Sequence, residues 1–243
     1  MPSARLEVRG LSLHVGTRPL LLDFNWQVLP GQRWCVIGRN ASGKSTLLRA
    51  LAGLPVPRRA GQVLWQGRPQ ADWPAPDAAL LRAYAPQHNT DRFAINVGRL
   101  LALSTLRPDA TATAELLAAL DIHELIHRDV RTLSGGERQR VALAQCAVQG
   151  APLMLMDEPV SFQDPAHQAV VARWMAAQVP GERALVFSAH DVNWVSGTAT
   201  HVLALLGDGQ WRAGPCAALM SADLLQRVYG CAWRHVGGVW LTC

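Results

Sequence analysis

Residues 38–46 read Gly38-Arg39-Asn40-Ala41-Ser42-Gly43-Lys44-Ser45-Thr46, a glycine-bounded loop that ends in a lysine and two hydroxyl side chains. An apolar run at 34–37 precedes the loop, and a helix-forming run at 47–52 follows it. Strand, loop and helix in this order are the context in which such a loop binds phosphate. Backbone N–H groups of the loop and the helix N-terminus would surround the phosphate, Lys44 would reach the outer phosphates, and Ser45 can ligate Mg²⁺.

Composition restricts the class of protein. Of the 23 basic side chains all but Lys44 are arginine. We infer that this position requires a compact ammonium group and that a planar guanidinium would not replace it. The net charge of +5 is spread along the chain and does not indicate a nucleic-acid surface. Five scattered cysteines argue against a disulfide framework or a zinc site. No run approaches the roughly 18 apolar residues that span a bilayer, and we expect a cytoplasmic location.

A second motif supplies carboxylates. The apolar run Leu153–Met156 predicts a buried strand, and Asp157 and Glu158 follow it directly. Asp157 is placed to hold the Mg²⁺ shell, and Glu158 is suited to polarise a water for attack on a γ-phosphate. On its own this segment would indicate only a strand that ends in an acidic turn, so the pairing with the loop at 38–46 carries the interpretation.

A third motif lies at residues 133–140, Leu133-Ser134-Gly135-Gly136-Glu137-Arg138-Gln139-Arg140. Ser134 can cap the following helix with Glu137 in the capping-box position, and Gly135 and Gly136 expose backbone amides at its positive end. The simplest reading is a well-capped helix. The alternative is a second anion-binding helix terminus.

The octamer resembles the signature of ATP-binding cassette (ABC) ATPases at every position, and it lies between the phosphate loop and the acidic strand as in that family. The resemblance implies that ATP and Mg²⁺ are bound, and it extends over nearly the whole chain. Gln87 is similar to the glutamine that touches Mg²⁺ and relays to a transmembrane partner. His190 is similar to the histidine that contacts the γ-phosphate, and residues 161–164 stand where the family has its D-loop.

Two positions depart from the family pattern. The D-loop usually has an apolar residue before its aspartate, where this chain has Gln163. Family members often place an aromatic residue about 29 positions before the lysine, where this chain has Val15 with His14 beside it. Either His14 replaces the missing ring, or adenine is held loosely.

The fold class predicted from these patterns is α/β, a P-loop core with a mainly parallel sheet. Residues 5–28 alternate apolar and polar side chains, which predicts an antiparallel region. Buried strands are expected at Trp34–Ile37, Leu153–Met156 and Ala184–Ser188. The resemblance implies one domain over 1–243, with an inserted α-helical subdomain at about 70–132 that contains a helix at Ala112–Leu120.

Partners follow from the same resemblance. One lysine loop and two anion-binding helix ends suggest a head-to-tail homodimer in which each signature completes the partner's ATP site. We expect the ATPase subunit of a transporter, peripheral on the cytoplasmic face of the inner membrane, with separate permease subunits and no direct nucleic-acid contact. The alternatives are an exporter ATPase, and a soluble ABC ATPase that acts on ribosomes or DNA.

The C-terminal segment bears on the cargo. Residues 220–230 resemble the closing segment of ATPases that serve importers of iron-siderophores, haem and vitamin B12, with Ser221 as a cap and Gly230 as a stop. Together with the coupling surface expected over 87–97, this favours import of a metal chelate. An ordinary docking helix would explain the same residues without reference to cargo.

Overall fold

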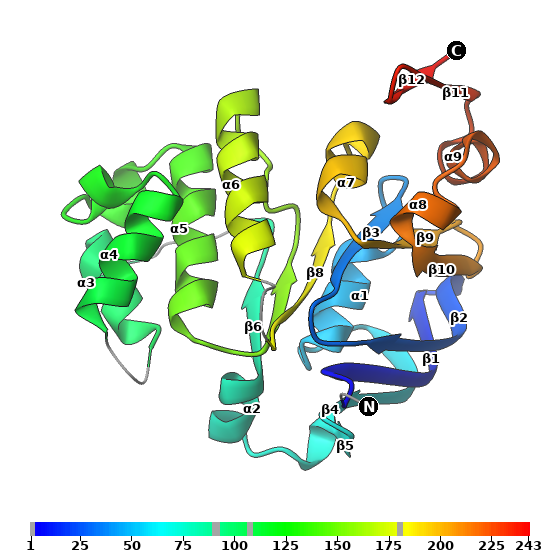
Figure 1. Cartoon of the computed structure of the whole chain (residues 1–243). Helices are drawn as coiled ribbons and strands as arrows, with labels where there is room; N and C mark the ends of the chain where they lie inside the picture. The colour runs from blue at the N-terminus through cyan, green and yellow to red at the C-terminus, as the bar shows by residue number, and fades with distance from the viewer. Residues whose placement is uncertain (1–2, 89–92, 106–108, 179–181) are drawn as a thin grey trace.

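The computed structural model describes residues 3–88, 93–105, 109–178 and 182–243 (Figure 1). An antiparallel sheet forms the N-terminal region, with strand order β2-β1-β4-β5. Its members are β1 (Leu6–Val15), β2 (Arg18–Val28), β4 (Arg58–Trp65) and β5 (Arg68–Pro69). Alternate side chains of β1 are buried on both sides of a register shift that lies between Val8 and Leu11. The alternation predicted for residues 5–28 is therefore confirmed.

The central sheet has the strand order β10-β9-β3-β8-β7-β6. Its members are β3 (Arg33–Gly38), β6 (Arg82–Ala85), β7 (Leu153–Met156), β8 (Ala184–Ser188), β9 (His201–Leu205) and β10 (Trp211–Pro215). All neighbouring pairs are parallel except β9 with β10. The mainly parallel α/β core predicted from the sequence is confirmed.

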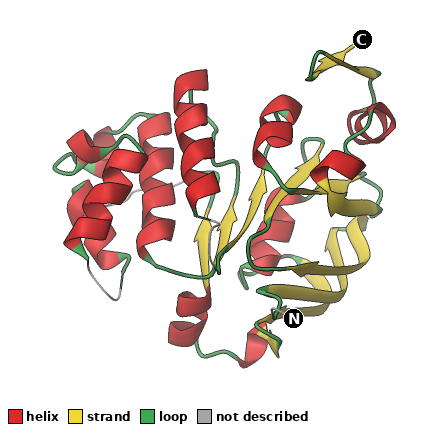
Figure 2. Cartoon of the chain, in the orientation of Figure 1, coloured by secondary structure: helices red, strands yellow, loops and turns green. Residues whose placement is uncertain are grey.

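Figure 2 shows that most helices lie along the central sheet and at the side of the molecule away from the antiparallel sheet. The helices are α1 (Lys44–Leu51), α2 (Ala75–Leu81), α3 (Val97–Leu103), α4 (Ala110–Ala119), α5 (Gly135–Val148), α6 (Pro165–Ala177), α7 (Val192–Thr198), α8 (Cys216–Leu219) and α9 (Ala222–Tyr229). Short 3₁₀ turns are η1 (Gln70–Asp72), η2 (His123–Leu125) and η3 (Val130–Thr132), and a C-terminal hairpin pairs β11 (Trp233–Val236) with β12 (Val239–Thr242). Within the described residues, no helix is long and apolar enough to cross a membrane.

The central sheet is buried on both faces. In β7, Leu153 and Leu155 belong to a cluster shared with α1 and the antiparallel sheet, whereas Met154 and Met156 belong to a cluster shared with α5, α6 and α7. Successive side chains of a strand point to opposite faces, so one short strand contributes to both halves of the core. This burial explains why the strands read as continuous apolar runs.

The segment 70–132 is not helical throughout. It includes β6, which pairs in parallel with β7 as the edge of the central sheet. The helices α3 and α4 contact α5 instead, and Figure 1 shows these three grouped at the side of the molecule away from the antiparallel sheet. We retain as a proposal the single domain over 1–243 with a helical subdomain at about 70–132, and within this segment β6 belongs to the central sheet.

The topology brings the predicted motifs to one edge. Strands β6, β7, β8 and β3 are mutually parallel neighbours, and their carboxyl ends lead into Gln87, the Asp157–Glu158 pair, His190 and the loop at 38–46. Ligands of open α/β sheets bind outside the carboxyl ends of the strands. Residues more than a hundred positions apart in sequence thus meet at a single place.

Candidate active site

The loop between β3 and α1 presents a helix N-terminus without a side-chain cap. Gly43, the N-cap of α1, has a φ of 103°, and Ala41 also has a positive φ of 59°. A Cβ atom on Gly38 would lie 2.4 Å from Oγ of Ser42, which is buried. The glycines therefore permit a tight turn, and no side chain competes for the first-turn N–H groups that an anion would use.

The side chain of Lys44 folds back over this loop. Its Nζ donates to the carbonyl oxygens of Gly38 at 3.0 Å and Arg39 at 3.2 Å, and the residue is 6% exposed. Burial lowers the pKa of the Lys44 ammonium, and the negative charges of Glu158 and Asp157 oppose that shift. The ammonium is thus within the electrostatic field of both carboxylates while it is hydrogen-bonded to the loop.

A cavity of about 550 Å³ opens at this edge, within the size range of ligand pockets. Its lining comes from the β1–β2 hairpin, the loop before α1 and the ends of β6, β7 and β8. The lining residues are Val15, Arg18, Leu20, Asn40, Ala41, Gly43, Lys44, Ser45, Thr46, Gln87, Glu158 and His190. A larger cavity of about 640 Å³ between α4, α5 and α6 contains none of the predicted site residues.

Glu158 is the centre of a hydrogen-bond network in the cavity. Its Oε2 accepts from Nε2 of Gln87 at 2.7 Å and from Oγ of Ser161 at 2.8 Å. Its Oε1 accepts from Nε2 of His190. The backbone of Glu158 has a φ of 51°, an uncommon conformation for a residue with a side chain. The predicted trio of Gln87, Glu158 and His190 is therefore assembled around one carboxylate.

Asp157 lies behind the cavity lining. It is 2% exposed, and its Oδ1 accepts from Oγ of Ser188 at 2.6 Å. The same Ser188 oxygen accepts from the backbone N–H of Glu158 at 2.9 Å. Ser161 belongs to the segment that resembles the D-loop, but no sequence pattern assigns a role to Ser161 or Ser188. The available signal is position alone, since Ser188 ends the buried strand β8 next to β7.

The signature residues lie outside this cavity. Ser134 is the N-cap of α5 and accepts from the backbone N–H of Glu137 at 3.3 Å, while Glu137 Oε2 accepts from the backbone N–H of Ser134 at 2.7 Å. The predicted capping box is thus formed. The Ser134 N–H is the main cause that lowers the pKa of the Glu137 carboxyl. Gly135 and Gly136 do not line the cavity of their own chain.

The D-loop packs directly on the signature glycines. A Cβ atom on Gly136 would lie 2.9 Å from the carbonyl oxygen of Phe162, whose φ is 64° and which is 66% exposed. At Gln163, where the family pattern has an apolar residue, the side-chain amide oxygen is buried. It has no hydrogen-bond partner among the described residues. Asp164 caps α6 by accepting from the backbone N–H of His167 at 2.9 Å. The two loops therefore form one surface.

The hairpin end of the cavity is the part of the site where the family pattern lacks its aromatic ring. Val15 lines the cavity and is 49% exposed, whereas His14 is not among the lining residues. His14 pairs with Pro19 of β2 and Arg58 of β4. Two lining residues that the motifs do not mark, Arg18 and Leu20, lie beside Val15. The sequence marks these two residues only by their position within the antiparallel region predicted at 5–28.

The site combines an uncapped helix N-terminus, a buried ammonium and a carboxylate network at the carboxyl edge of a parallel sheet. An N-terminus and a cation attract phosphate, and a carboxylate in the same cavity can accept a proton from a water. The fold and site therefore define a P-loop nucleotide hydrolase.

Comparison with known proteins identifies the family. A family model described as ABC transporter matches residues 21–161, more than half of the chain. The hemin import ATP-binding protein HmuV of Streptomyces coelicolor is 38% identical over 229 residues, covering 90% of this chain and 81% of that protein. The vitamin B12 import ATP-binding protein BtuD of Vibrio cholerae is 33% identical over 243 residues, covering 94% and 95%. The chain belongs to the ABC transporter family and is its ATP-binding, ATP-hydrolysing component.

Solved structures share the fold. A putative metal-chelate type ABC transporter in an inward-facing conformation aligns with a TM-score of 0.78 at 22% identity, covering 98% of this chain and 96% of that one. A bacterial Atm1-family exporter with ATP bound aligns at 0.77 and 22% identity, covering 93% of this chain and 41% of that one. A metal-chelate type transporter and an exporter thus share this fold.

The C-terminal helix has the predicted ends. Ser221 is the N-cap of α9 and accepts from the backbone N–H of Leu224 at 3.2 Å, and Gly230 ends the helix with a φ of 79°. Leu224, Leu225 and Val228 are buried against the central sheet, at the helical spacing expected.

Proposed function

We propose that the cavity binds ATP with Mg²⁺ and that Glu158 is the general base for hydrolysis. The observation that carries this proposal is the Glu158 carboxylate, which shares a cavity with Lys44 and is oriented by hydrogen bonds from Gln87 and Ser161. A water that attacks the γ-phosphorus would pass its proton to this carboxylate as the new O–P bond forms, while the bond from the γ-phosphorus to the β–γ bridging oxygen breaks and ADP leaves. His190, on the other carboxylate oxygen, would contact the γ-phosphate.

The phosphates would occupy the loop before α1. Lys44 would exchange its two carbonyl contacts for phosphate oxygens, which an ammonium with rotatable donors can do without moving the backbone. Backbone N–H groups would bind the remaining oxygens. The residues proposed to bind the nucleotide in this loop are Gly38, Asn40, Ala41, Ser42, Gly43, Lys44, Ser45 and Thr46.

The proposed Mg²⁺ ligands fit the metal's preference for oxygen. Ser45 and Gln87 line the cavity, and the buried carboxylate of Asp157 is fixed through Oδ1 by Ser188. Mg²⁺ keeps several waters and is usually held by one or two protein groups and the substrate phosphates. When bound, the ion would neutralise charge on the phosphates. Asp157 would hold a water of its shell.

Replacing Glu158 tests the chemistry. Glu158→Gln should leave ATP affinity within about twofold of the parent and reduce turnover by roughly 10²–10⁴-fold, the usual contribution of a general base. Glu182→Gln is the matched control, because Glu182 is an exposed residue that pairs with Arg5 away from the cavity. Hydrolysis by Glu158→Gln at the parental rate would exclude Glu158 as the base.

The proposal includes a head-to-tail homodimer. Ser134, Gly135 and Gly136 lie outside the cavity of their own chain, and in a dimer they would complete the cavity of the partner. ATP bound without hydrolysis should stabilise this dimer, since the γ-phosphate would bridge the two chains. Light scattering of Glu158→Gln with ATP should report twice the monomer mass, and a monomer under saturating ATP contradicts the arrangement.

We further propose that the chain powers import of a metal chelate, namely an iron-siderophore, haem or a cobalamin. Support comes from relatives named for hemin and vitamin B12 import. Separate transmembrane permeases would contact the chain at the cytoplasmic face of the inner membrane. The coupling surface is proposed at 87–97, of which residues 89–92 lie outside the described part of the chain. Asn96 in this segment caps α3.

Uptake assays test the cargo. A deletion strain should lose uptake of one chelate among haem, cobalamin and ferric siderophores, and the parental gene but not Glu158→Gln should restore it. Unchanged uptake of all three contradicts the importer proposal and favours an exporter. Fractionation tests the remaining alternative, because a chain that sediments with ribosomes or DNA instead of membranes is not a transporter subunit.

A further inference from the structure

The cavity has two ends with different chemistry. At one end the Glu158 carboxylate binds Gln87 and His190 and lies close enough to the Lys44 ammonium to affect its pKa. The other end is the β1–β2 hairpin, which contributes Val15, Arg18 and Leu20. A nucleotide with its terminal phosphate at the first end would direct its base toward the hairpin.

Leu20 fixes the hairpin against the phosphate loop. It is 4% exposed, and a Cβ atom on Gly43 would lie 3.0 Å from the Leu20 Cβ. Arg18 lines the same cavity as Leu20. Val15 is the register partner of Arg18 across the hairpin, and directly opposed residues also share a face. Arg18 and Val15 therefore continue outward along the cavity wall.

Arg18 supplies the planar group at this end. Among the described residues that line the cavity there is no Phe, Tyr or Trp, and the one ring, His190, belongs to the phosphate end. The Arg18 Nη2 donates to the carbonyl oxygen of Gly207 at 3.5 Å, which directs the side chain toward the β9–β10 turn. Within the described residues no carboxylate forms an ion pair with Arg18. The faces of the guanidinium are therefore not committed to a charge partner.

We propose that the Arg18 guanidinium is the surface on which the nucleobase stacks, with Val15 as an apolar contact beside it. The inference rests on the proposed ATP site and adds the residue that holds the base. Nucleic-acid bases stack on guanidinium planes as they do on aromatic rings. Because every base has a π face, stacking discriminates poorly between bases. ATP and GTP should consequently bind with affinities within about tenfold of each other.

A base-free ligand separates stacking from charge. We would measure affinities for ATP, GTP and inorganic tripolyphosphate by titration calorimetry with the full chain. Arg18→Ala should weaken ATP and GTP by about tenfold, or about 1.4 kcal/mol, and leave tripolyphosphate within twofold. Arg18→Lys keeps the charge without the plane and should behave like Arg18→Ala. Arg18→Tyr should restore ATP affinity, because a ring replaces the guanidinium.

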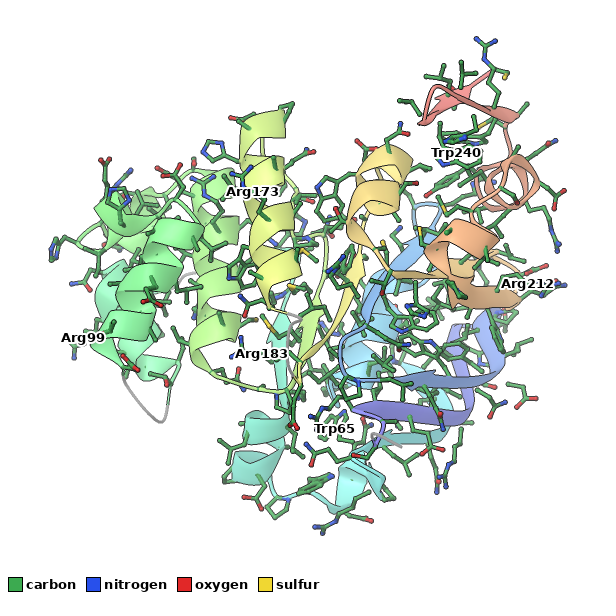
Figure 3. All side chains as sticks on the ribbon, in the orientation of Figure 1. Trp65, Arg99, Arg173, Arg183, Arg212 and Trp240 are labelled. Atoms are coloured by element: carbon green, nitrogen blue, oxygen red, sulfur yellow. The ribbon has the colours of Figure 1, made fainter. Side chains whose placement is uncertain are left out.

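The controls keep the inference distinct from the ATP site itself. Arg212→Ala removes an exposed arginine of β10 that does not line the cavity (Figure 3) and should bind all three ligands as the parent does. A parallel loss of ATP and tripolyphosphate in Arg18→Ala, or rescue by Arg18→Lys, would show that Arg18 binds phosphate and would overturn the inference. Unchanged ATP affinity in Arg18→Ala would also overturn it. If Lys44→Ala keeps parental affinity for tripolyphosphate, the proposed site fails instead.

Discussion

The N-termini of α1 and α5 are both glycine-rich, yet they differ in how their backbone groups are satisfied. At α1 the N-cap is Gly43, no side chain caps the helix, and the first turn has no acidic residue. At α5 the N-cap Ser134 and Glu137 cap each other, so the helix end carries its own carboxylate. A helix end without a cap is prepared for an external anion, whereas a capped end is stable without one.

The surroundings of the two helices reinforce this difference. Buried residues of α1 belong to the cluster between the two sheets, so the phosphate loop is held by both. The start of α5 instead touches the exposed loop at 161–164. In the proposed dimer, the first end binds the nucleotide of its own chain and the second binds that of its partner. Substitutions at four positions test this division.

Lys44→Ala should have the largest effect because it removes the cation of the α1 end. Hydrogen bonds to charged groups contribute about 1.5–3 kcal/mol, so ATP affinity should fall by roughly 10- to 150-fold and turnover should be lost. Lys44→Arg should not restore binding, since the position is buried and a planar guanidinium is bulkier. Isothermal titration measures the affinities. If Lys44→Ala binds ATP as tightly as the parent does, the N-terminal end of α1 is not the nucleotide-binding end.

Ser134 distinguishes a capping role from an anion-binding role at the α5 end. Ser134→Asp keeps a good N-cap but adds negative charge, so turnover should fall by roughly a hundredfold, as when one transition-state donor is lost. Ser134→Ala loses the cap and should cost about 1 kcal/mol of stability. Nucleotide affinity of the monomer should stay within about twofold in both. If turnover falls in Ser134→Ala, which loses stability, and not in Ser134→Asp, which gains charge, then α5 has a structural role only.

Gly136→Ala tests the contact between α5 and the D-loop. The added Cβ would meet the Phe162 carbonyl oxygen at 2.9 Å, so the loop must shift at a cost of about 1–3 kcal/mol. Gly197→Ala in α7 is the matched control, because a Cβ there meets nothing within 4 Å. Denaturant titration should show destabilisation only in Gly136→Ala. Equal stability of both variants would mean that the two loops adjust freely.

Glu137→Gln should have the smallest effect, about 0.5 kcal/mol at neutral pH. The folded-state pKa of Glu137 is lowered, chiefly by the Ser134 N–H. The carboxylate therefore contributes stability above its unfolded-state pKa and loses that contribution as the pH falls through the folded-state pKa. The stability difference between parent and variant should shrink as the pH falls below the ordinary glutamate pKa of 4.5 toward the lowered folded-state pKa. A difference that is independent of pH contradicts the ionic capping box.

Much of the site was predictable from the sequence because its parts are local. The loop at 38–46, the strand ending at Asp157 and the cap at Ser134 each depend on neighbours in the chain. The strand β6 was less accessible, since it is short and becomes a strand only by pairing with β7. Arg18 and Ser188 carry no motif, and only the fold brings them to the cavity lining and to Asp157.

The sequence by itself determined the fold class, the phosphate loop and the identity of the residues that meet at the edge of the sheet. Turn geometry, capping and apolar periodicity depend on residues that lie within a few positions of each other, so they can be predicted from the sequence. The tertiary structure alone decided that one carboxylate, Glu158, receives Gln87, Ser161 and His190 together. It also decided that Val15 rather than His14 lines the cavity and that the capped end of α5 lies outside the cavity of its own chain. Such relations depend on strand order and register, which are fixed only when the sheet is assembled and its two faces are buried.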